Sequence, residues 1–192
     1  MISTNHYEVA FEAYLRAREV GFVSVNEARR TFLGDSDVKS LDFIVVGPHD
    51  AKLVVDVKGR RFPGGTPQAP RFVWQNWAEN DDIDGLARWA THFGPDFRGI
   101  LAFAYHIEPP FQLPADTPDL FAFRDAKYLM RAVEVSVYRS RMRRRSPRWG
   151  TVGLSVADFR EVVKPFSTFL RPEESPQPVP VASDRKGIPR GL

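Results

Sequence analysis

The sequence contains no cysteine. This excludes disulfide scaffolds, thiol nucleophiles and metal sites built on thiolates. The four histidines show none of the short spacings at which one helix presents two imidazoles to the same metal ion. Metal chemistry is therefore left to oxygen or imidazole ligands, and a histidine-rich zinc site is not expected.

Long apolar runs are also missing, because none approaches the roughly 18 residues needed to cross a bilayer. The first residues lack the basic and apolar regions of a secretory signal. We therefore expect a soluble cytoplasmic protein without membrane association. Residues 172–192 are rich in proline and contain no aromatic side chain, which predicts a disordered tail after a single domain at 1–171.

Hydrophobic periodicity predicts the elements of this domain. A first helix is expected at about 5–19, a short strand at 22–25 and a hairpin from strands 41–46 and 52–57. After a loop at 62–70, the pattern predicts a helix at about 82–93, a strand at 99–107, a second hairpin at 120–124 and 127–133, and a closing helix at 156–170 interrupted near Pro165. The order predicts an α/β layered domain with an additional C-terminal hairpin and helices.

Charged residues at the end of an otherwise apolar strand are the most informative feature of this pattern. Asp56 and Lys58 are two positions apart and therefore point to the same face of their strand. Asp42 on the preceding strand lies directly across from Asp56 if paired residue numbers sum to 98, a register that requires a five-residue turn at 47–51. The hairpin is then expected to bring two carboxylates together.

Facing carboxylates repel each other unless they share a proton or a cation lies between them. A hard divalent ion with oxygen ligands is the simplest remedy, and Mg²⁺ is the expected ion, with Mn²⁺ as a substitute. Lys58 beside such an ion is expected to orient or deprotonate a water molecule, since a crowded cationic site lowers the pKa of an amine. The alternative is a solvated Asp56–Lys58 pair with only a structural role.

At these residues the sequence resembles the PD-(D/E)XK nuclease superfamily, which has the restriction-endonuclease-like fold. The resemblance implies a core of helix, three-stranded antiparallel meander, helix and strand, and it covers about residues 5–107. Asp42 matches the acid of the second strand, Asp56-Val57-Lys58 matches the Asp/Glu-x-Lys tripeptide of the third, and Glu8 matches the helix glutamate. The family's metal site implies Asp42, Asp56, Glu8 and the Val57 carbonyl as ligands here. Leu41 stands where the family often has proline.

The helix acid has two candidates, because Glu8 and Glu12 lie four residues apart on one helical face. Glu8 is preferred, since its phase relative to the apolar residues is similar to that in archaeal-type Holliday junction resolvases. Alternatively, Glu8 forms a capping box with Asn5. Glu12 can pair with Arg16 at the surface.

Basic residues are concentrated between residues 139 and 148, which include six arginines and no acid in a chain of net charge +3. Guanidinium groups suit phosphate oxygens, so this segment predicts nucleic-acid binding by Arg139, Arg141, Arg143, Arg144, Arg145 and Arg148, with Trp149 stacking on a base or sugar. Arg60 and Arg61 are expected at the mouth of the acidic site, where they would position a phosphate. The alternatives are a solvated basic turn for the run and pairing with Asp81 or Asp82 for Arg60 and Arg61.

These features together predict a Mg²⁺-dependent nuclease that hydrolyses phosphodiester bonds in DNA, with a homodimer as a further possibility. Two other functions fit the same sequence. One is a non-catalytic nucleic-acid-binding module on the same fold. The other is an interaction protein that uses the proline-rich tail and the arginine run to recruit an acidic partner.

Overall fold

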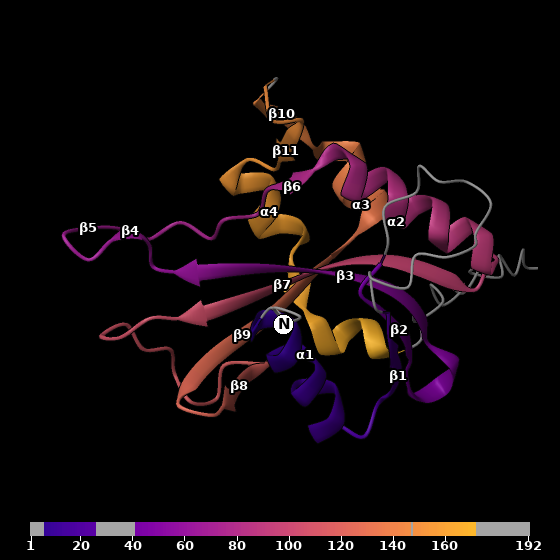
Figure 1. The fold of residues 1–192 in the computed structure, drawn as a ribbon, viewed down its shortest axis with the longest axis horizontal. Helices are drawn as coiled ribbons and strands as arrows, with labels where there is room; N and C mark the ends of the chain where they lie inside the picture. Colours follow the sequence, from indigo (N-terminus) through magenta and orange to yellow (C-terminus); the bar gives the residue numbers. More distant parts are fainter. Residues whose placement is uncertain (1–5, 26–40, 147, 172–192) are drawn as a thin grey trace, which may run out of the picture.

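The computed structural model describes residues 6–25, 41–146 and 148–171. Seven strands form one curled sheet in the order β1-β2-β3-β7-β9-β12, with β8 paired to β9 (Figure 1). These strands are β1 (Gly21–Ser24), β2 (Phe43–Val46), β3 (Lys52–Phe62), β7 (Phe97–Ile107), β8 (Leu120–Phe123), β9 (Ala126–Glu134) and β12 (Lys164–Pro165). The β3 and β7 strands are parallel, and the other neighbouring pairs are antiparallel.

Helices cover both faces of the sheet. Helix α1 (His6–Ala17) and the 3-10 helix η3 (Phe166–Leu170) pack on one face, where Phe11 of α1 joins Val55 and Val57 of β3 in the core. On the other face, α2 (Asn80–Phe93), α3 (Val135–Arg141) and α4 (Val156–Val162) share a second core with Val54. Because strand side chains alternate between faces, Asp56 and Lys58 point to the same side as Val54, towards α2.

The predicted meander, helix and strand are present in the predicted order, as strands β1 to β3, helix α2 and strand β7. The register sum of 98 is confirmed along β2, where Phe43 pairs with Val55 and Val46 with Lys52. The five-residue turn contains the 3-10 helix η2 (Pro48–Asp50), and the N–H of Gly47 donates to the carbonyl of Ala51 at 2.7 Å. The five-residue length of the turn therefore fixes the register in which paired residue numbers sum to 98.

Several segments differ from the sequence prediction. Strand β3 continues to Phe62. Part of the expected 62–70 loop forms a ribbon of β4 (Gly64–Thr66) and β5 (Ala69–Arg71). In this ribbon Gly65 adopts a φ of +83°, which glycine tolerates at no steric cost. The closing helix ends at Val162, because Pro165 disfavours helical backbone at the preceding residue, and the chain continues as β12 and η3.

The arginine run is largely exposed, as the solvated alternative expects, but it forms a helix end and a strand rather than one turn. It begins in α3 and continues in β10 (Arg143–Ser146). Strand β10 pairs with β11 (Thr151–Gly153), which pairs with β6 (Ala78–Glu79). The predicted tail, the capping residue Asn5 and residues 26–40 lie outside the described residues. No helix in the described part of the chain is long and apolar enough to span a membrane.

Candidate functional site

Strands β2 and β3 bring Asp42 and Asp56 close together, although not directly opposite each other. The Asp42 N–H donates to the carbonyl of Val55 at 2.9 Å, and Val55 is also the partner of Phe43, so the pairing shifts by one residue. The Asp42 carboxylate accepts a hydrogen bond from the Val57 N–H at 2.6 Å, where a strand would normally offer a backbone carbonyl. The predicted register is thus wrong at this last position, but the two carboxylates remain neighbours.

The surroundings of Asp42 disfavour its charged form. Burial and the nearby charge of Asp56 raise the pKa of the Asp42 carboxyl to about 7, and the charge of Glu8 adds to this effect. The Val57 N–H and the Lys58 ammonium act in the opposite direction and lower the pKa. Repulsion between the two strand carboxylates, which the sequence predicted, is therefore present in the fold.

Lys58 lies between two carboxylates. Its Nζ is 2.7 Å from Oδ2 of Asp56 and 2.7 Å from Oδ2 of Asp82, and only 15% of its side chain is exposed. Burial lowers the pKa of the Lys58 ammonium, but Asp56 and Asp82 outweigh burial and raise it above its ordinary value. In the metal-free protein the two carboxylates therefore favour the charged form of Lys58, whereas the lowered pKa is expected beside a bound cation.

Asp82 is a member of this cluster that the sequence analysis missed. It is 4% exposed and lies in the first turn of α2, where its carboxylate accepts the Glu79 N–H at 2.9 Å as part of a capping box. The Glu79-x-x-Asp82 spacing was the available signal for this cap. Only the packing of α2 on the sheet shows that the capping acid also reaches Lys58.

The two candidate acids of α1 have different surroundings. Glu8 is half-buried in the first turn, and its negative charge contributes to the raised pKa of Asp42. Glu12 pairs with Arg16 at 2.7 Å on the exposed side of the helix, as one of the alternatives predicted. The charge of Glu8 therefore reaches the acidic hairpin, while Glu12 is engaged elsewhere.

A glycine allows α1 to approach this part of β3. A Cβ placed on Gly59 would lie 2.1 Å from Cδ2 of Tyr7, so the tyrosine ring occupies the space of the missing side chain. Tyr7 directly precedes Glu8. The close approach at Gly59 therefore sets how near Glu8 comes to the strand carrying Asp56 and Lys58.

Arg60 does not lie at the mouth of the site as expected. It is 8% exposed, and its guanidinium stacks over the Trp77 ring at 3.9 Å and donates to the carbonyls of Gly59 and Trp77. Burial lowers its pKa, which the nearby tyrosines and Asp82 partly oppose. Arg61 is exposed and points to the opposite face from Lys58, where it donates to the Gly65 carbonyl at 3.0 Å.

The arginine run divides into two groups. Three members pair with acids of the domain: Arg139 with Asp84 at 3.2 Å, Arg141 with Glu161 at 2.8 Å, and Arg143 with Asp158 at 3.7 Å.

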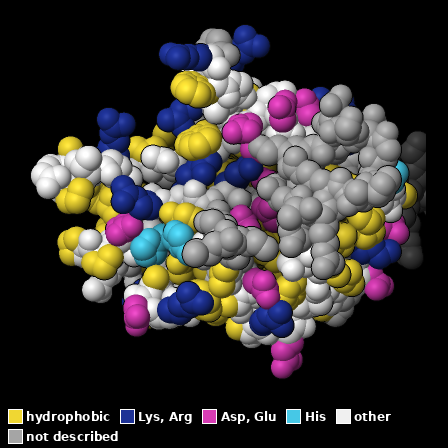
Figure 2. Space-filling view, viewed as in Figure 1, with side chains coloured by type: hydrophobic (Ala, Val, Ile, Leu, Met, Phe, Trp, Pro, Cys, Tyr) yellow, Lys and Arg dark blue, Asp and Glu magenta, His cyan; other side chains and the backbone are white. Residues whose placement is uncertain are grey.

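No acid among the described residues forms an ion pair with the remaining arginines of the run, Arg144, Arg145 and Arg148. Arg148 lies 5.3 Å from the ring of Trp149, which is 69% exposed. Figure 2 shows basic side chains on the upper part of this face, near the β10 hairpin.

The donor set fits a hard cation, although the described residues contain no ready-made cluster of three or more histidine, aspartate or glutamate ligands. Asp42 and Asp56 supply carboxylate oxygens in a buried setting where their negative charges repel. A divalent ion bound by both would relieve that repulsion. Of the other predicted ligands, Glu8 acts on the site through its charge, and the Val57 side chain packs in the core beside α1.

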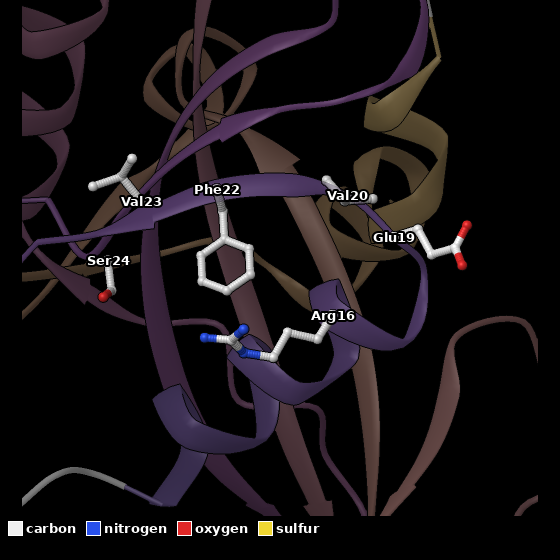
Figure 3. Close-up of a pocket in the computed structure, with 6 residues that line it drawn as sticks. All are labelled: Arg16, Glu19, Val20, Phe22, Val23 and Ser24. Atoms are coloured by element: carbon white, nitrogen blue, oxygen red, sulfur yellow. The ribbon is translucent and has the colours of Figure 1, made fainter.

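The hollow shown in Figure 3 is separate from these acids. It has a volume of about 560 Å³ and lies beside the edge strand β1. Its lining comprises Arg16, Glu19, Val20, Phe22, Val23 and Ser24. The Arg16 guanidinium lies 5.1 Å from the centre of the Phe22 ring, so two of the lining side chains form a cation–π contact.

The protein is a mixed α/β protein, and neighbouring strands of its central sheet carry the charged side chains of the acidic hairpin. No family model and no curated protein matches the sequence. Among solved structures, the chain is similar to a Holliday junction resolvase from the archaeal hyperthermophile Archaeoglobus fulgidus. That match has 12% sequence identity and a TM-score of 0.48, and it covers 85% of this chain and 98% of the other.

Proposed function

We propose that this protein is a divalent-metal-dependent nuclease that hydrolyses phosphodiester bonds in DNA. One observation carries the proposal. Asp42 and Asp56 approach each other at neighbouring strands, with the Lys58 ammonium 2.7 Å from Asp56. Two acids and a lysine in a helix–meander–helix–strand core match the arrangement that the resemblance to PD-(D/E)XK nucleases implies.

The residues have distinct roles in this proposal. Asp42 and Asp56 would hold Mg²⁺ or Mn²⁺, with Glu8 and the Val57 carbonyl completing the protein ligands. The ion would polarise the phosphoryl oxygen and activate a water molecule. Lys58, held by Asp56 and Asp82, would place a positive charge beside the negative charge that develops on the phosphate. A homodimer would allow two such sites to cut both strands.

Cleavage assays with an exposed-acid control test this function. Fluorescently labelled duplex, single-stranded and branched DNA would be incubated with the protein in Mg²⁺, Mn²⁺ or EDTA. Asp56→Asn is expected to abolish metal-dependent cleavage. Asp96→Asn is the control, because Asp96 is 72% exposed and pairs with Lys52 at the other end of β3. Full activity in Asp56→Asn contradicts the proposal.

A second pair of variants isolates the helix acid. Glu8→Gln is expected to reduce cleavage, because it removes a charge that acts on Asp42. Glu12→Gln removes only an exposed pair with Arg16 and is expected to retain activity. Equal loss in both variants would contradict the role proposed for Glu8.

One observation favours a non-catalytic nucleic-acid-binding module as the second candidate. The Lys58 ammonium pairs with both Asp56 and Asp82, so these acids have a structural partner that does not depend on a metal ion. Such a module would bind DNA in EDTA and cleave none of the substrates in Mg²⁺ or Mn²⁺. Cleavage that depends on Asp56 would exclude it.

A further inference from the structure

A groove of about 440 Å³ runs between the β4–β5 ribbon and strand β10. Arg71, at the end of β5, lies on one side, and Arg143, Arg144 and Arg145 of β10 lie on the other. Both ribbons project from the body of the molecule in Figure 1. Two segments far apart in the sequence thus line one groove with four arginines.

The electrostatics of the groove favour an anionic occupant. No carboxylate of the described residues lines it. Among the groove arginines, Arg143 forms an ion pair, with Asp158 at 3.7 Å. Arg71, Arg144 and Arg145 are exposed and form no ion pair with an acid in the described ranges. Their positive charges are therefore available to a ligand with regularly spaced negative groups.

The floor of the groove is held in place by buried hydrogen bonds. Asn76 exchanges two of them with the backbone of Leu154, at 3.2 and 3.0 Å. The hydroxyls of Tyr105 and Tyr138 donate to the carbonyls of Gln75 and Asn76, at 2.9 and 2.7 Å. The floor is therefore preorganised, and a ligand would not have to order it on binding.

Trp77 connects the groove to the strand of the acidic site. Its ring carries the Arg60 guanidinium at 3.9 Å and the Arg145 guanidinium at 5.8 Å. Arg60 follows Lys58 by two residues and points to the same face of β3. One indole ring therefore separates a groove arginine from the face that bears Asp56 and Lys58.

We propose that this groove binds the sugar–phosphate backbone of a single DNA strand and leads it to the acidic site. The inference rests on the proposed nuclease function and specifies its substrate as DNA with a single-stranded segment next to the cut. A volume of about 440 Å³ is within the range of small-ligand pockets, which fits a short stretch of one strand. Positively charged grooves that follow the backbone are the usual way to bind single strands.

Binding measured without metal tests the groove apart from catalysis. Fluorescence anisotropy in EDTA would follow a thymidine oligonucleotide of about 20 nucleotides, longer than most single-strand sites. Arg71→Ala combined with Arg144→Ala is expected to weaken binding about tenfold or more, because charge-assisted contacts are lost. The slope of log K against log salt should fall in magnitude by about 1.4, or about 0.7 for each phosphate contact.

The control removes the same number of positive charges as the test variant, both from the arginine run. Arg139→Ala combined with Arg141→Ala removes two arginines that pair with Asp84 and Glu161. We expect this variant to change the affinity and the salt slope much less than the Arg71→Ala and Arg144→Ala combination does. Equal weakening by both double variants overturns the proposal, since the run would then act as diffuse charge. Wild-type affinity for a duplex that matches its affinity for the single strand also overturns it.

Cleavage separates this proposal from the nuclease function. If the groove variants lose oligonucleotide binding but the wild-type protein cleaves no substrate, the groove is upheld and the nuclease function fails. If Asp56→Asn abolishes cleavage while the groove variants bind and cleave single-strand-containing DNA normally, the nuclease function is upheld and the groove fails. In an active protein, the groove variants are expected to raise KM rather than lower kcat.

Discussion

Lys58 on β3 and Asp82 in the first turn of α2 form a buried ion pair, with 2.7 Å between Nζ and Oδ2. The pair joins the sheet to the helix that covers it. Since Asp82 also caps α2 through the Glu79 N–H, one carboxylate both starts the helix and positions the site lysine. The N-terminus of α2 is therefore part of the support of the acidic site.

Replacing Asp82 tests this double role. Asp82→Asn keeps an acceptor for the cap but leaves Lys58 with Asp56 as its charged partner. We expect the free energy of unfolding to fall by about 2 kcal/mol, the usual value of a hydrogen bond to a charged group. Urea unfolding would measure the loss, and the cleavage assay would show reduced activity through the displaced lysine.

Asp84→Asn is the matched control on the same helix. Asp84 pairs with Arg139 at 3.2 Å, with both side chains more than one third exposed. Such a pair contributes less than about 1 kcal/mol, so the variant should unfold nearly as the wild type does. Equal destabilisation by the two variants would show that Asp82 acts only as one of several surface acids of α2.

The raised pKa of Asp42 predicts a pH-dependent stability of the metal-free protein. Burial and Asp56 raise this pKa from 3.8 to about 7. Between these two pH values the folded state therefore keeps a proton on Asp42 that the unfolded state has lost. This carboxyl therefore lowers the stability of the fold as pH rises from about 4 to about 7, and the loss is complete above that range.

Asp42→Asn removes this contribution. Unfolding in urea with EDTA, repeated from pH 4 to pH 8, would give the stability difference between wild type and variant. We expect the variant to gain stability relative to wild type as pH rises through this window. A constant difference would contradict a raised Asp42 pKa. Added Mg²⁺ is expected to stabilise the wild type at pH 8, because the ion would take the place of the proton.

Gly59→Ala tests the close approach of α1 to β3. The new Cβ would lie 2.1 Å from Cδ2 of Tyr7, so the helix must move and Glu8 must move with it. Overpacking of this kind costs about 1–3 kcal/mol. We expect lower thermal stability and weaker metal-dependent cleavage than in the wild type.

A second substitution at Tyr7 shows whether the contact is responsible. In a Tyr7→Ala background, Gly59→Ala should have little additional effect on stability, because the ring that would clash is gone. The double-mutant cycle would then give a large coupling between the two positions. Additive effects would instead mean that Gly59 serves another purpose in β3.

Local sequence pattern was sufficient for the core of this fold. Apolar strand patterns at 41–46 and 52–57 predicted the hairpin, and a five-residue turn at 47–51 corresponds to the register seen along β2. These features depend on contacts between residues near in sequence, where strand period and turn length leave few options. The longer reach of β3 and the β4–β5 ribbon were missed, because glycines and prolines in that segment suggested a loop.

The sequence by itself determined that Asp56 and Lys58 share a face and that Asp42 lies on the neighbouring strand, since side-chain direction follows from strand period alone. Tertiary structure decided the partners of these residues. It placed Asp82 against Lys58, where the two neighbouring acids raise the lysine pKa in the metal-free protein, and it buried Arg60 on Trp77. These outcomes depend on how α2 and its preceding segment pack on the sheet, and such long-range packing sets the burial and charge around each group.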